Sequence, residues 1–436
     1  MTVQMNAPTL RFGEFEGQWS KVTFDDLNIN VIDGDRGTQY PNKNELLPEG
    51  YCLFLSAKNV TKSGFQFSEM QFITQEKDGL LRKGKLKRGD IVLTTRGSVG
   101  HKALYTDEVV FDSLRINSGM VLLRHQWKEL SNEFVYKSMF TRHFTKQIDV
   151  VAFGSAQPAL TVKEIKKLKL SVPPTLPEQQ KIASFLSKID EKIGLLSEKK
   201  DKLTEYKRGV MQQLFNGKWH EQDGQLNFVP PTLRFKADDG SEFPAWEERE
   251  FDDIFNFSTG KNIKQNEASP EFDTPCVRYG ELYHMYGEVI TTVVNGTNLE
   301  HSELTFSNGN EILLPSAGED PLDIGSASAL TLSDVAIGRT INVLRPKGNI
   351  DYCPVYVSFY INEKLRKKIS TLARGASISN VYNSDLRGLS LPLPSIEEQY
   401  VIKSFLLKIE EKLKLTNSEL EKAKEWKKGL LQQMFV

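Results

Sequence analysis

The stretch EQQKIASFLSKIDEKIGLLSEKKDKLTEYKRGVMQQLF, residues 178–215, decides the fold because the chain contains it twice. The second copy, EQYVIKSFLLKIEEKLKLTNSELEKAKEWKKGLLQQMF, occupies residues 398–435, and 18 of the 38 aligned positions are identical without a gap. A long internal repeat of this kind indicates one polypeptide built from two related halves. The remainder of the chain is therefore expected to follow the same duplication.

Both copies have the apolar periodicity of a long helix. Apolar residues recur every seventh position, with aromatic residues three positions further on, as in a coiled-coil seam. At ~1.5 Å per residue each helix would be roughly 57 Å long, so each needs a long partner surface. Antiparallel pairing of the two copies is the simplest arrangement, and a generic coiled-coil dimer is the alternative. The predicted seam residues are Ile182, Phe185, Ile189, Tyr206 and Val210 in the first copy and Ile402, Phe405, Ile409, Trp426 and Leu430 in the second.

The predicted seam is interrupted by polar residues. Lys192, Lys199 and Gln213 occupy interleaved positions of the first copy, so two helices alone would close poorly. The second copy carries an adjacent apolar row that includes Leu413 and Leu420. We therefore expect this row to dock helices of a partner protein.

Length and composition limit the class of protein. A chain of 436 residues is expected to form at least two domains. It has no run of 18 apolar residues and no N-terminal stretch typical of a signal peptide. Cys52, Cys276 and Cys353 are too scattered for a disulfide framework or a zinc site and are expected to pack in the core. A cytoplasmic location, with no membrane contact, is the prediction.

Charge is distributed unevenly along the chain. Residues 1–177 contain 24 Lys and Arg against 19 Asp and Glu, whereas residues 219–395 contain 15 against 25. A surface that binds nucleic acid is usually basic. Any phosphate contacts of the second block must therefore come from a local patch, or the block must share a surface with something more basic.

The repeat extends beyond the helices. The segment PTLRF at residues 8–12, followed by Trp19, returns at residues 231–235, followed by Trp246. Before each helix an alternating apolar segment ends in proline, as a short edge strand does. The predicted division is a first domain at residues 1–175, a long helix at 176–217, a linker and second domain at 218–394, and a second long helix at 395–436.

Inside the two blocks the pattern predicts an α+β fold. Segments 132–148 and 356–372 have helical periodicity. The blocks agree well at their ends and poorly in the middle, as expected for two related sites that bind different ligands. The predicted strands are Tyr51–Ser56, Asp90–Thr95, Met120–Arg124, Cys276–Tyr279, Glu311–Leu314 and Thr340–Leu344.

The sequence lacks the motifs of the main enzyme classes. It contains no GxxxxGK[ST] phosphate loop, no GxSxG elbow and no NPPY-type methyltransferase tetrapeptide. The six histidines show no metal-binding spacing, and the acidic stretch at residues 318–323 is better explained as a polar turn. No catalytic residue, metal ligand or cofactor is therefore assigned to this chain.

Several predicted loops carry groups that could contact duplex DNA. Such contacts need donors to phosphate and polar side chains that reach base edges. Each group could equally be a solvated surface residue, but Arg96 and Arg278, flanked by strand patterns and glycine, favour a binding role. The candidates are Lys58, Asn59, Arg82, Lys83, Lys85, Arg96, Ser98, Ser155 and Gln157 in the first block and Arg278, Tyr279, Tyr283, Ser316, Arg339, Arg374 and Ser377 in the second.

The repeated motifs resemble a known family over essentially the whole chain. The PTLRF…W openings, the LxLxxP exits and the EQ…SFLxKI…GxxQQxF helices are similar to those of the specificity subunit of type I restriction–modification systems. The resemblance implies a non-catalytic chain with two target-recognition domains. Each domain would read one half of a bipartite, asymmetric site in double-stranded DNA, and the antiparallel helices would act as the spacer.

The resemblance also implies partner subunits. Two modification subunits would methylate adenine with S-adenosylmethionine, and two restriction subunits, which are motor–nucleases using ATP and Mg²⁺, would join for defence against foreign DNA. Gly154, Ser155 and Gln157 match the family's Gly-Ser-x-Gln loop near DNA, whereas Ile378 stands at the position of Gln157 in the second copy. The alternative hypothesis is a coiled-coil scaffold or adaptor protein without DNA specificity.

Overall fold

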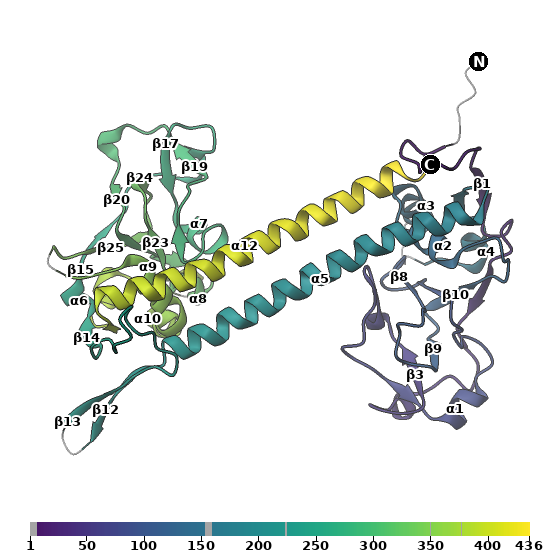
Figure 1. Cartoon of the computed structure of the whole chain (residues 1–436), viewed down its shortest axis with the longest axis horizontal. Coiled ribbons are helices and arrows are strands. Elements are labelled where there is room, and N and C mark those ends of the chain that lie inside the picture. The colour runs from purple at the N-terminus through teal and green to yellow at the C-terminus, as the bar shows by residue number, and fades with distance from the viewer. Residues whose placement is uncertain (1–6, 153–158, 223–224, 349, 376) are drawn as a thin grey trace. The chain divides into compact units, whose positions relative to one another are not determined.

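The computed structural model describes residues 7–152, 159–222, 225–348, 350–375 and 377–436. By its internal contacts the chain divides into two compact units (Figure 1). Unit 1 comprises residues 1–197 and 418–436, and unit 2 comprises residues 198–417. Each unit therefore combines one α+β block with parts of both long helices. The serial division into four parts remains a prediction.

The repeated segments form the two longest helices of the described chain, α5 (Leu176–Leu214) and α12 (Ile396–Gln433). In unit 1, Ile182 near the start of α5 shares a core with Leu430 near the end of α12, and Leu196 packs with Leu420. The start of α5 therefore lies against the end of α12, so the two helices run in opposite directions here. This contact confirms the predicted antiparallel pairing within unit 1.

Unit 2 contains the complementary parts of the same two helices. Val210, on the last part of α5, shares a core with Ile402 and Ile409 on the first part of α12. The predicted seam residues Ile182, Ile189, Val210, Ile402, Ile409 and Leu430 are all buried.

Two aromatic members of the predicted seam are half-exposed, Tyr206 by 52% and Trp426 by 51%. An α-helix with 3.6 residues per turn drifts by about 20° per heptad from a strict seven-residue repeat, which moves such positions toward the margin of the seam. The ring of Trp426 still packs edge-on against Phe185 of the other helix, with centroids 6.1 Å apart. Phe185 and Phe405 are half-buried, and their rings pack against other aromatic rings, Phe12 at 5.7 Å and Phe235 at 5.2 Å.

The apolar row that was expected to dock a partner is covered by the chain itself. Leu420 is buried against Leu196 and Ala423, and Leu413 is half-buried on the core of unit 2. The neighbouring members of the row, Leu406 and Met434, are also buried. The prediction of partner docking at Leu413 and Leu420 was therefore wrong, because the other helix and the α+β blocks fill that face.

The block of unit 1 is built on a four-stranded antiparallel sheet with the strand order β2-β10-β7-β8. A second sheet, β6-β3-β9, contains the parallel pair β3 and β9. The edge pair β1–β11 lies next to the start of α5 in the chain. The strands are β1 (Ser20–Thr23), β2 (Asn30–Asp33), β3 (Cys52–Leu55), β4 (Val60–Thr61), β5 (Gly64–Phe65), β6 (Phe72–Ile73), β7 (Ile91–Thr94), β8 (Lys102–Leu104), β9 (Leu114–Ile116), β10 (Met120–Arg124) and β11 (Lys169–Val172), and the helices are α1 (Gln75–Leu80), α2 (Asn132–Ser138), α3 (Arg142–Ala152) and α4 (Val162–Lys166).

The block of unit 2 repeats this plan. The order β15-β25-β21-β23 corresponds to β2-β10-β7-β8, the pair β14–β27 corresponds to β1–β11, and the second sheet again contains a parallel pair, β17 with β24. Its main strands are β14 (Glu247–Glu250), β15 (Phe255–Thr259), β17 (Thr274–Val277), β18 (Val289–Ile290), β19 (Asn295–Thr297), β20 (Phe306–Asn308), β21 (Glu311–Pro315), β22 (Ala317–Gly318), β23 (Ser328–Leu330), β24 (Ser333–Ile337), β25 (Ile341–Pro346), β26 (Ser379–Asn380) and β27 (Ser390–Leu393), with β16 (Ala268–Ser269) at an edge. Its helices are α6 (Phe251–Ile254), α7 (Tyr279–His284), α8 (Pro321–Ile324), α9 (Pro354–Tyr360), a π turn (Ile361–Leu365), α10 (Arg366–Leu372) and α11 (Asn383–Leu386).

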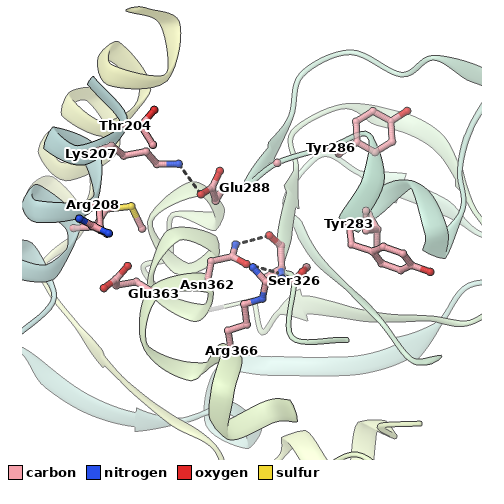
Figure 2. A pocket seen from close by; sticks show the side chains of 14 residues that line it. Thr204, Lys207, Arg208, Tyr283, Tyr286, Glu288, Ser326, Asn362, Glu363 and Arg366 are labelled. Atoms are coloured by element: carbon pink, nitrogen blue, oxygen red, sulfur yellow. Dashed lines mark hydrogen bonds and ion pairs between the residues drawn. The ribbon is translucent and has the colours of Figure 1, made fainter. Parts of the chain in front are cut away.

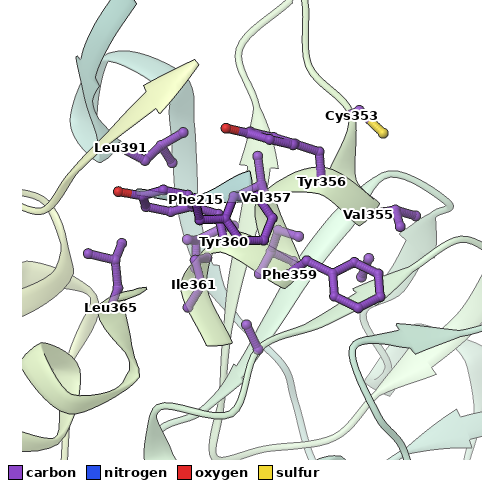
Figure 3. Close-up of a cluster of buried hydrophobic side chains, with 14 of the residues drawn as sticks. Phe215, Cys353, Val355, Tyr356, Val357, Phe359, Tyr360, Ile361, Leu365 and Leu391 are labelled. Carbon is purple, nitrogen blue, oxygen red and sulfur yellow. The ribbon is translucent and has the colours of Figure 1, made fainter. Parts of the chain in front are cut away.

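The core of unit 2 is centred on α9. Nearly every residue of this helix is buried, which is typical of a helix surrounded by the core. Phe215, at the end of α5, packs edge-on against Tyr356 and Tyr360 with ring centroids 5.8 and 5.5 Å apart (Figure 3). Tyr356 also donates a hydrogen bond to the carbonyl oxygen of Pro392 at 3.0 Å. The predicted helical segment 356–372 is thus two helices joined by a π turn.

The segment predicted as a linker, 218–231, forms a hairpin of β12 (Lys218–Gln222) and β13 (Gln225–Val229). Trp219 and Phe228 pack against each other across it at 5.3 Å. The alternating aromatic residues around an Asp-Gly dipeptide are a hairpin signal that the linker prediction overlooked. Among the described helices, none is long and apolar enough to cross a membrane.

Candidate nucleic-acid interface

The opening motif of unit 1 fastens its block to the start of α5. Arg11 donates two hydrogen bonds to the Glu178 carboxylate, Nε to Oε1 at 2.7 Å and Nη2 to Oε2 at 2.8 Å. Trp19 Nε1 donates to the same carboxylate at 3.3 Å. Glu178 is fully buried in the first turn of the helix, where the helix dipole also stabilises its charge. Its hydrogen bond raises the pKa of Arg11.

Unit 2 contains the same arrangement. Arg234 donates to both oxygens of Glu398 at 2.9 Å, and Trp246 Nε1 donates at 3.1 Å. Bidentate pairs of this kind fix geometry as well as charge. The duplicated Arg, Trp and Glu of the sequence therefore set how each block is held on the helices, and they are not themselves an exposed binding surface.

The glutamine after each of these glutamates makes a second attachment. Gln179 Oε1 accepts the backbone N–H of Ser131 at 3.0 Å, just before α2. Gln399 Oε1 accepts the backbone N–H of Cys353 at 2.9 Å, just before α9. The repeated Glu-Gln dipeptide thus joins both ends of each block to its helix.

A hollow of unit 1 is lined by residues 33–39, Leu80, Arg82 and Lys83, and so includes two of the predicted DNA contacts. The backbone N–H of Arg82 donates to Asp35 Oδ2 at 2.8 Å, which fixes the loop and leaves the side chain exposed. In the described part of the chain, Arg82 and Lys83 form no ion pair. Two predicted residues are therefore brought together as free cations.

Arg36 belongs to the same hollow and was not predicted. Its Nη2 donates to Asp33 Oδ1 at 3.1 Å and to the carbonyl oxygen of Ser118 at 3.3 Å, so it links two loops. The only sequence signal was a basic residue in a Gly-Asp-Arg-Gly turn, which is too common to single out.

Arg96 and Ser98 follow β7 and are exposed. Thr95 donates its backbone N–H to Gly119 at 2.8 Å, so the Arg96 loop lies beside the loop that carries Ser118. Arg96 has no ion-pair partner among the residues described. Ser155 and Gln157 lie outside the described residues.

Three predicted contacts of unit 1 are engaged by other groups of the block. Asn59 is 1% exposed, and its side chain is used inside the block, donating to the carbonyl oxygens of Gln66 and Glu69 at 3.0 and 2.7 Å. Lys85 is half-exposed but pairs with the buried carboxylate of Asp78. Lys58 is exposed and pairs with the exposed Glu69 at 2.5 Å, a bond that solvent weakens.

In unit 2, Tyr279 and Tyr283 of α7 line a hollow together with residues 317–320, Asp323 and Ile378. The Ser316 backbone joins this region to two other loops, because its N–H donates to Thr340 at 2.9 Å and its carbonyl accepts the N–H of Val381 at 3.0 Å. The hollow therefore carries aromatic and acidic side chains.

Arg278 has a structural role, and its predicted DNA contact stays a prediction. Its Nε donates to Glu281 Oε1 at 2.8 Å, and the carboxylate of Glu281, 2% exposed, also accepts from Asn295 at 2.8 Å. This network positions the first turn of α7. The remaining predicted residues are on the surface: Arg339 and Ser377 are exposed, and Arg374 is exposed while it pairs with Asp385 at 2.9 Å.

No reactive centre is evident near these surfaces. Within the described ranges, no group of three or more His, Cys, Asp or Glu is placed to hold a metal ion. The three cysteines are buried, as predicted, and burial raises the pKa of Cys52 to about 11 and of Cys276 to about 12. Both thiols are therefore protonated at neutral pH and poor nucleophiles.

Two duplicated α+β blocks, each fastened to paired long helices and each presenting polar loops, define a bivalent recognition protein. The family model of the type I restriction modification DNA specificity domain matches the chain twice, at residues 17–205 and 245–425. The chain belongs to this family, and it is a non-catalytic DNA-recognition subunit of a type I restriction–modification system.

Relatives and solved structures agree with this assignment. The putative type I restriction enzyme MjaX specificity subunit of Methanocaldococcus jannaschii is 24% identical, with 98% of this chain and 95% of that protein covered. The MjaVIII specificity subunit of the same organism is 22% identical, over 88% and 85%. The crystal structure of a type I S subunit from M. genitalium has the same fold, with a TM-score of 0.61, 18% identity and 99% of both chains covered. The comparisons give no support to a scaffold without DNA specificity.

Proposed function

We propose that each unit reads one half of a bipartite site in duplex DNA. The observation that carries this proposal is the set of exposed cations without ion pairs in unit 1, where Arg82 and Lys83 line the hollow and Arg96 lies on a separate loop. Lysine and arginine side chains contact phosphates, and arginine also reads guanine in the major groove. In unit 2 the corresponding groups are Arg339, Arg374 and the tyrosines of α7.

The test uses the chain in complex with its modification subunit. The double variant Arg82→Ala/Lys83→Ala should weaken binding to all duplexes and lower the salt dependence of binding by about two phosphate contacts. Lys128→Ala, an exposed lysine outside the hollow, is the matched control. Unchanged salt dependence in the double variant would contradict a phosphate contact at these residues.

The long helices act as the spacer between the half-sites. Deleting four residues, about one helical turn, from each helix at equivalent positions, within residues 198–203 and 418–423, keeps the helices in register. Methylation mapping should then show the same half-sites at a changed spacing. Altered half-sites at the original spacing would contradict the spacer role.

Two modification subunits dock on apolar residues that the duplication presents twice. Leu195 is 60% exposed and Leu415 is 57% exposed, at positions 220 residues apart, and the exposed Trp426 and Tyr206 have the same relation. Unit 1 holds Leu195 and Trp426, and unit 2 holds Leu415 and Tyr206. Each unit thus offers one leucine and one aromatic side chain, which supports two equal docking sites.

Aspartate substitutions give a direct test of the docking sites. Leu195→Asp should remove one modification subunit, and Leu195→Asp with Leu415→Asp should remove both, as measured by mass of the purified complex. Two modification subunits retained by the double variant would contradict this placement. The complex contains two modification subunits, which methylate adenine with S-adenosylmethionine. It also contains two restriction subunits, which use ATP and Mg²⁺.

A further inference from the structure

One interhelical ion pair occurs in both units with the helices exchanged. In unit 1, Lys427 of α12 lies with Nζ 2.5 Å from Asp190 Oδ1 of α5. In unit 2, Lys207 of α5 pairs with Glu410 of α12. Positions 190 and 410, and positions 207 and 427, are each 220 residues apart, so the pair is part of the duplication.

Each block adds a third charge to this pair, and the added charge has opposite sign in the two units. In unit 1 it is a cation: Lys137 of α2 lies with Nζ 2.6 Å from Asp190 Oδ2. In unit 2 it is an anion: Glu288 lies with Oε1 2.8 Å from Lys207 Nζ (Figure 2). The cluster of unit 1 therefore has two lysines and one carboxylate, and that of unit 2 has one lysine and two carboxylates.

The lysine of the helix pair also touches the block directly in both units. The ammonium of Lys427 lies 5.4 Å from the ring centre of Phe140, and that of Lys207 lies 5.5 Å from the ring centre of Phe359. These groups are partly buried, so their interactions are screened less than those of surface pairs. The contact that both units share is thus one lysine on one phenylalanine.

The chemistry of the pair explains how either sign is accommodated. A carboxylate has two oxygens, and Asp190 uses one for Lys427 and the other for Lys137. An ammonium has three donors, and Lys207 donates one hydrogen bond to Glu288 while it forms an ion pair with Glu410. We propose that this Lys–carboxylate pair is a contact site on the helices that can form an ion pair with one charged side chain of either sign from a recognition block.

A charge reversal in unit 1 tests whether the Lys–carboxylate pair accepts a side chain of either sign. Lys137→Glu should move the block-supplied charge from Asp190 to Lys427 and leave the block docked. In the full chain bound to its modification subunit, the rate of protease cleavage within α2 and the following loop should rise less than twofold. Lys427→Met alone should have a similarly small effect, because Lys137 still reaches Asp190.

The combinations decide the outcome. Lys137→Glu with Lys427→Met leaves two carboxylates facing each other, so cleavage should rise tenfold or more. Lys137→Glu with Asp190→Asn removes the repulsion and should return the rate to within twofold of wild type. Equal effects of Lys137→Glu on the cleavage rate with and without Lys427 would overturn the proposal, as would a tenfold or greater rise caused by Lys137→Glu alone.

The same test applies with reversed signs in unit 2. Glu288→Lys should be tolerated, because the introduced ammonium can pair with Glu410. Adding Glu410→Gln should release the block. If Glu288→Lys undocks the block to the same extent whether or not Glu410 is present, the helix pair has no capacity for a cation in this unit and the proposal fails.

Discussion

The two recognition blocks share the contacts that hold them and differ in the groups they expose. Arg11, Trp19 and Glu178 in unit 1 are matched by Arg234, Trp246 and Glu398 in unit 2, with the same hydrogen bonds. The hollow of unit 1 carries Arg82 and Lys83 without ion pairs beside Asp33 and Asp35, whereas the hollow described in unit 2, which is built from other loops, carries tyrosine, glutamate and aspartate. Duplication has therefore kept the attachment to the helices and left the loops free to diverge.

This division matches the charge of the two sequence blocks. The block of unit 2, with its excess of acidic residues, offers only local cations such as Arg339 and Arg374. We expect the block of unit 1 to supply most of the salt-dependent affinity. The block of unit 2 would then contribute chiefly through contacts to base edges, for which carboxylates can accept hydrogen bonds from cytosine.

The shared attachment should be the most sensitive feature. Glu178→Ala and Glu398→Ala each remove a buried carboxylate that accepts hydrogen bonds from an arginine and a tryptophan. Removing one partner of a buried pair costs ~3–5 kcal/mol, so each variant should lose about that much unfolding free energy in its own unit. Denaturant unfolding checks this, with the exposed neighbour Glu397→Ala as the control. A loss no larger than that of the control would contradict it.

A buried lysine should make unit 1 respond to alkaline pH. Lys102 is 5% exposed, donates to the carbonyl oxygen of Met139 at 2.6 Å and lies over the rings of Phe140 and Phe144. Burial lowers its pKa from 10.5 to about 8. Between these values the unfolded chain holds more protons than the folded chain, so stability rises with pH.

The Lys102→Met variant isolates this effect. The unfolding free energy of wild type minus that of the variant should increase by ~3 kcal/mol between pH 7.5 and pH 10.5. Below pH 8 the lysine is protonated in both states, and the cost of burying its charge is fully present. A difference that stays constant with pH would show that Lys102 has the same pKa in the folded and the unfolded chain, and would contradict the lowered value.

A smaller loss of stability is expected from substituting a glycine that, in each block, lies close to the backbone of a neighbouring loop. A Cβ on Gly34 would collide with the carbonyl oxygen of Asn117, and one on Gly260 would collide with that of Gly338. Forcing such contacts apart costs ~1–3 kcal/mol. Gly34→Ala and Gly260→Ala should each lower stability by that amount in thermal unfolding. Gly79→Ala, with open space around the added atom, should be neutral or stabilising, and equal behaviour of all three would count against the shared loop geometry.

Much of the scaffold could be predicted from the sequence because it is repeated. The 220-residue repeat gave the two helices, their antiparallel pairing and the aliphatic seam at Ile182, Ile189, Ile402 and Ile409. It did not show that Tyr206 and Trp426 lie toward the margin of the seam, since a heptad count ignores the drift of a straight helix. It also did not show that Leu420 is covered, since that depends on packing between segments distant in sequence.

The candidate interface was less predictable. Loop cations such as Arg82 and Arg96 could be found by residue type, but the sequence could not separate them from Arg278 or Asn59, which are used inside the blocks. The distinguishing information is the partner of each side chain, Glu281 for Arg278 and the backbone at residues 66 and 69 for Asn59. Arg36 was missed because its neighbours in space, Arg82 and Ser118, are far from it in the sequence.

The central claim, that each unit reads its own half-site, is tested most directly by mapping methylated adenines in DNA treated with variant complexes. Arg96→Ala should relax sequence recognition in one half-site, by about 1–3 kcal/mol of discrimination, and leave the other half-site unchanged. Arg339→Ala should affect only the other half-site. Relaxation of both half-sites by either variant, or of the same half-site by both, would contradict the account.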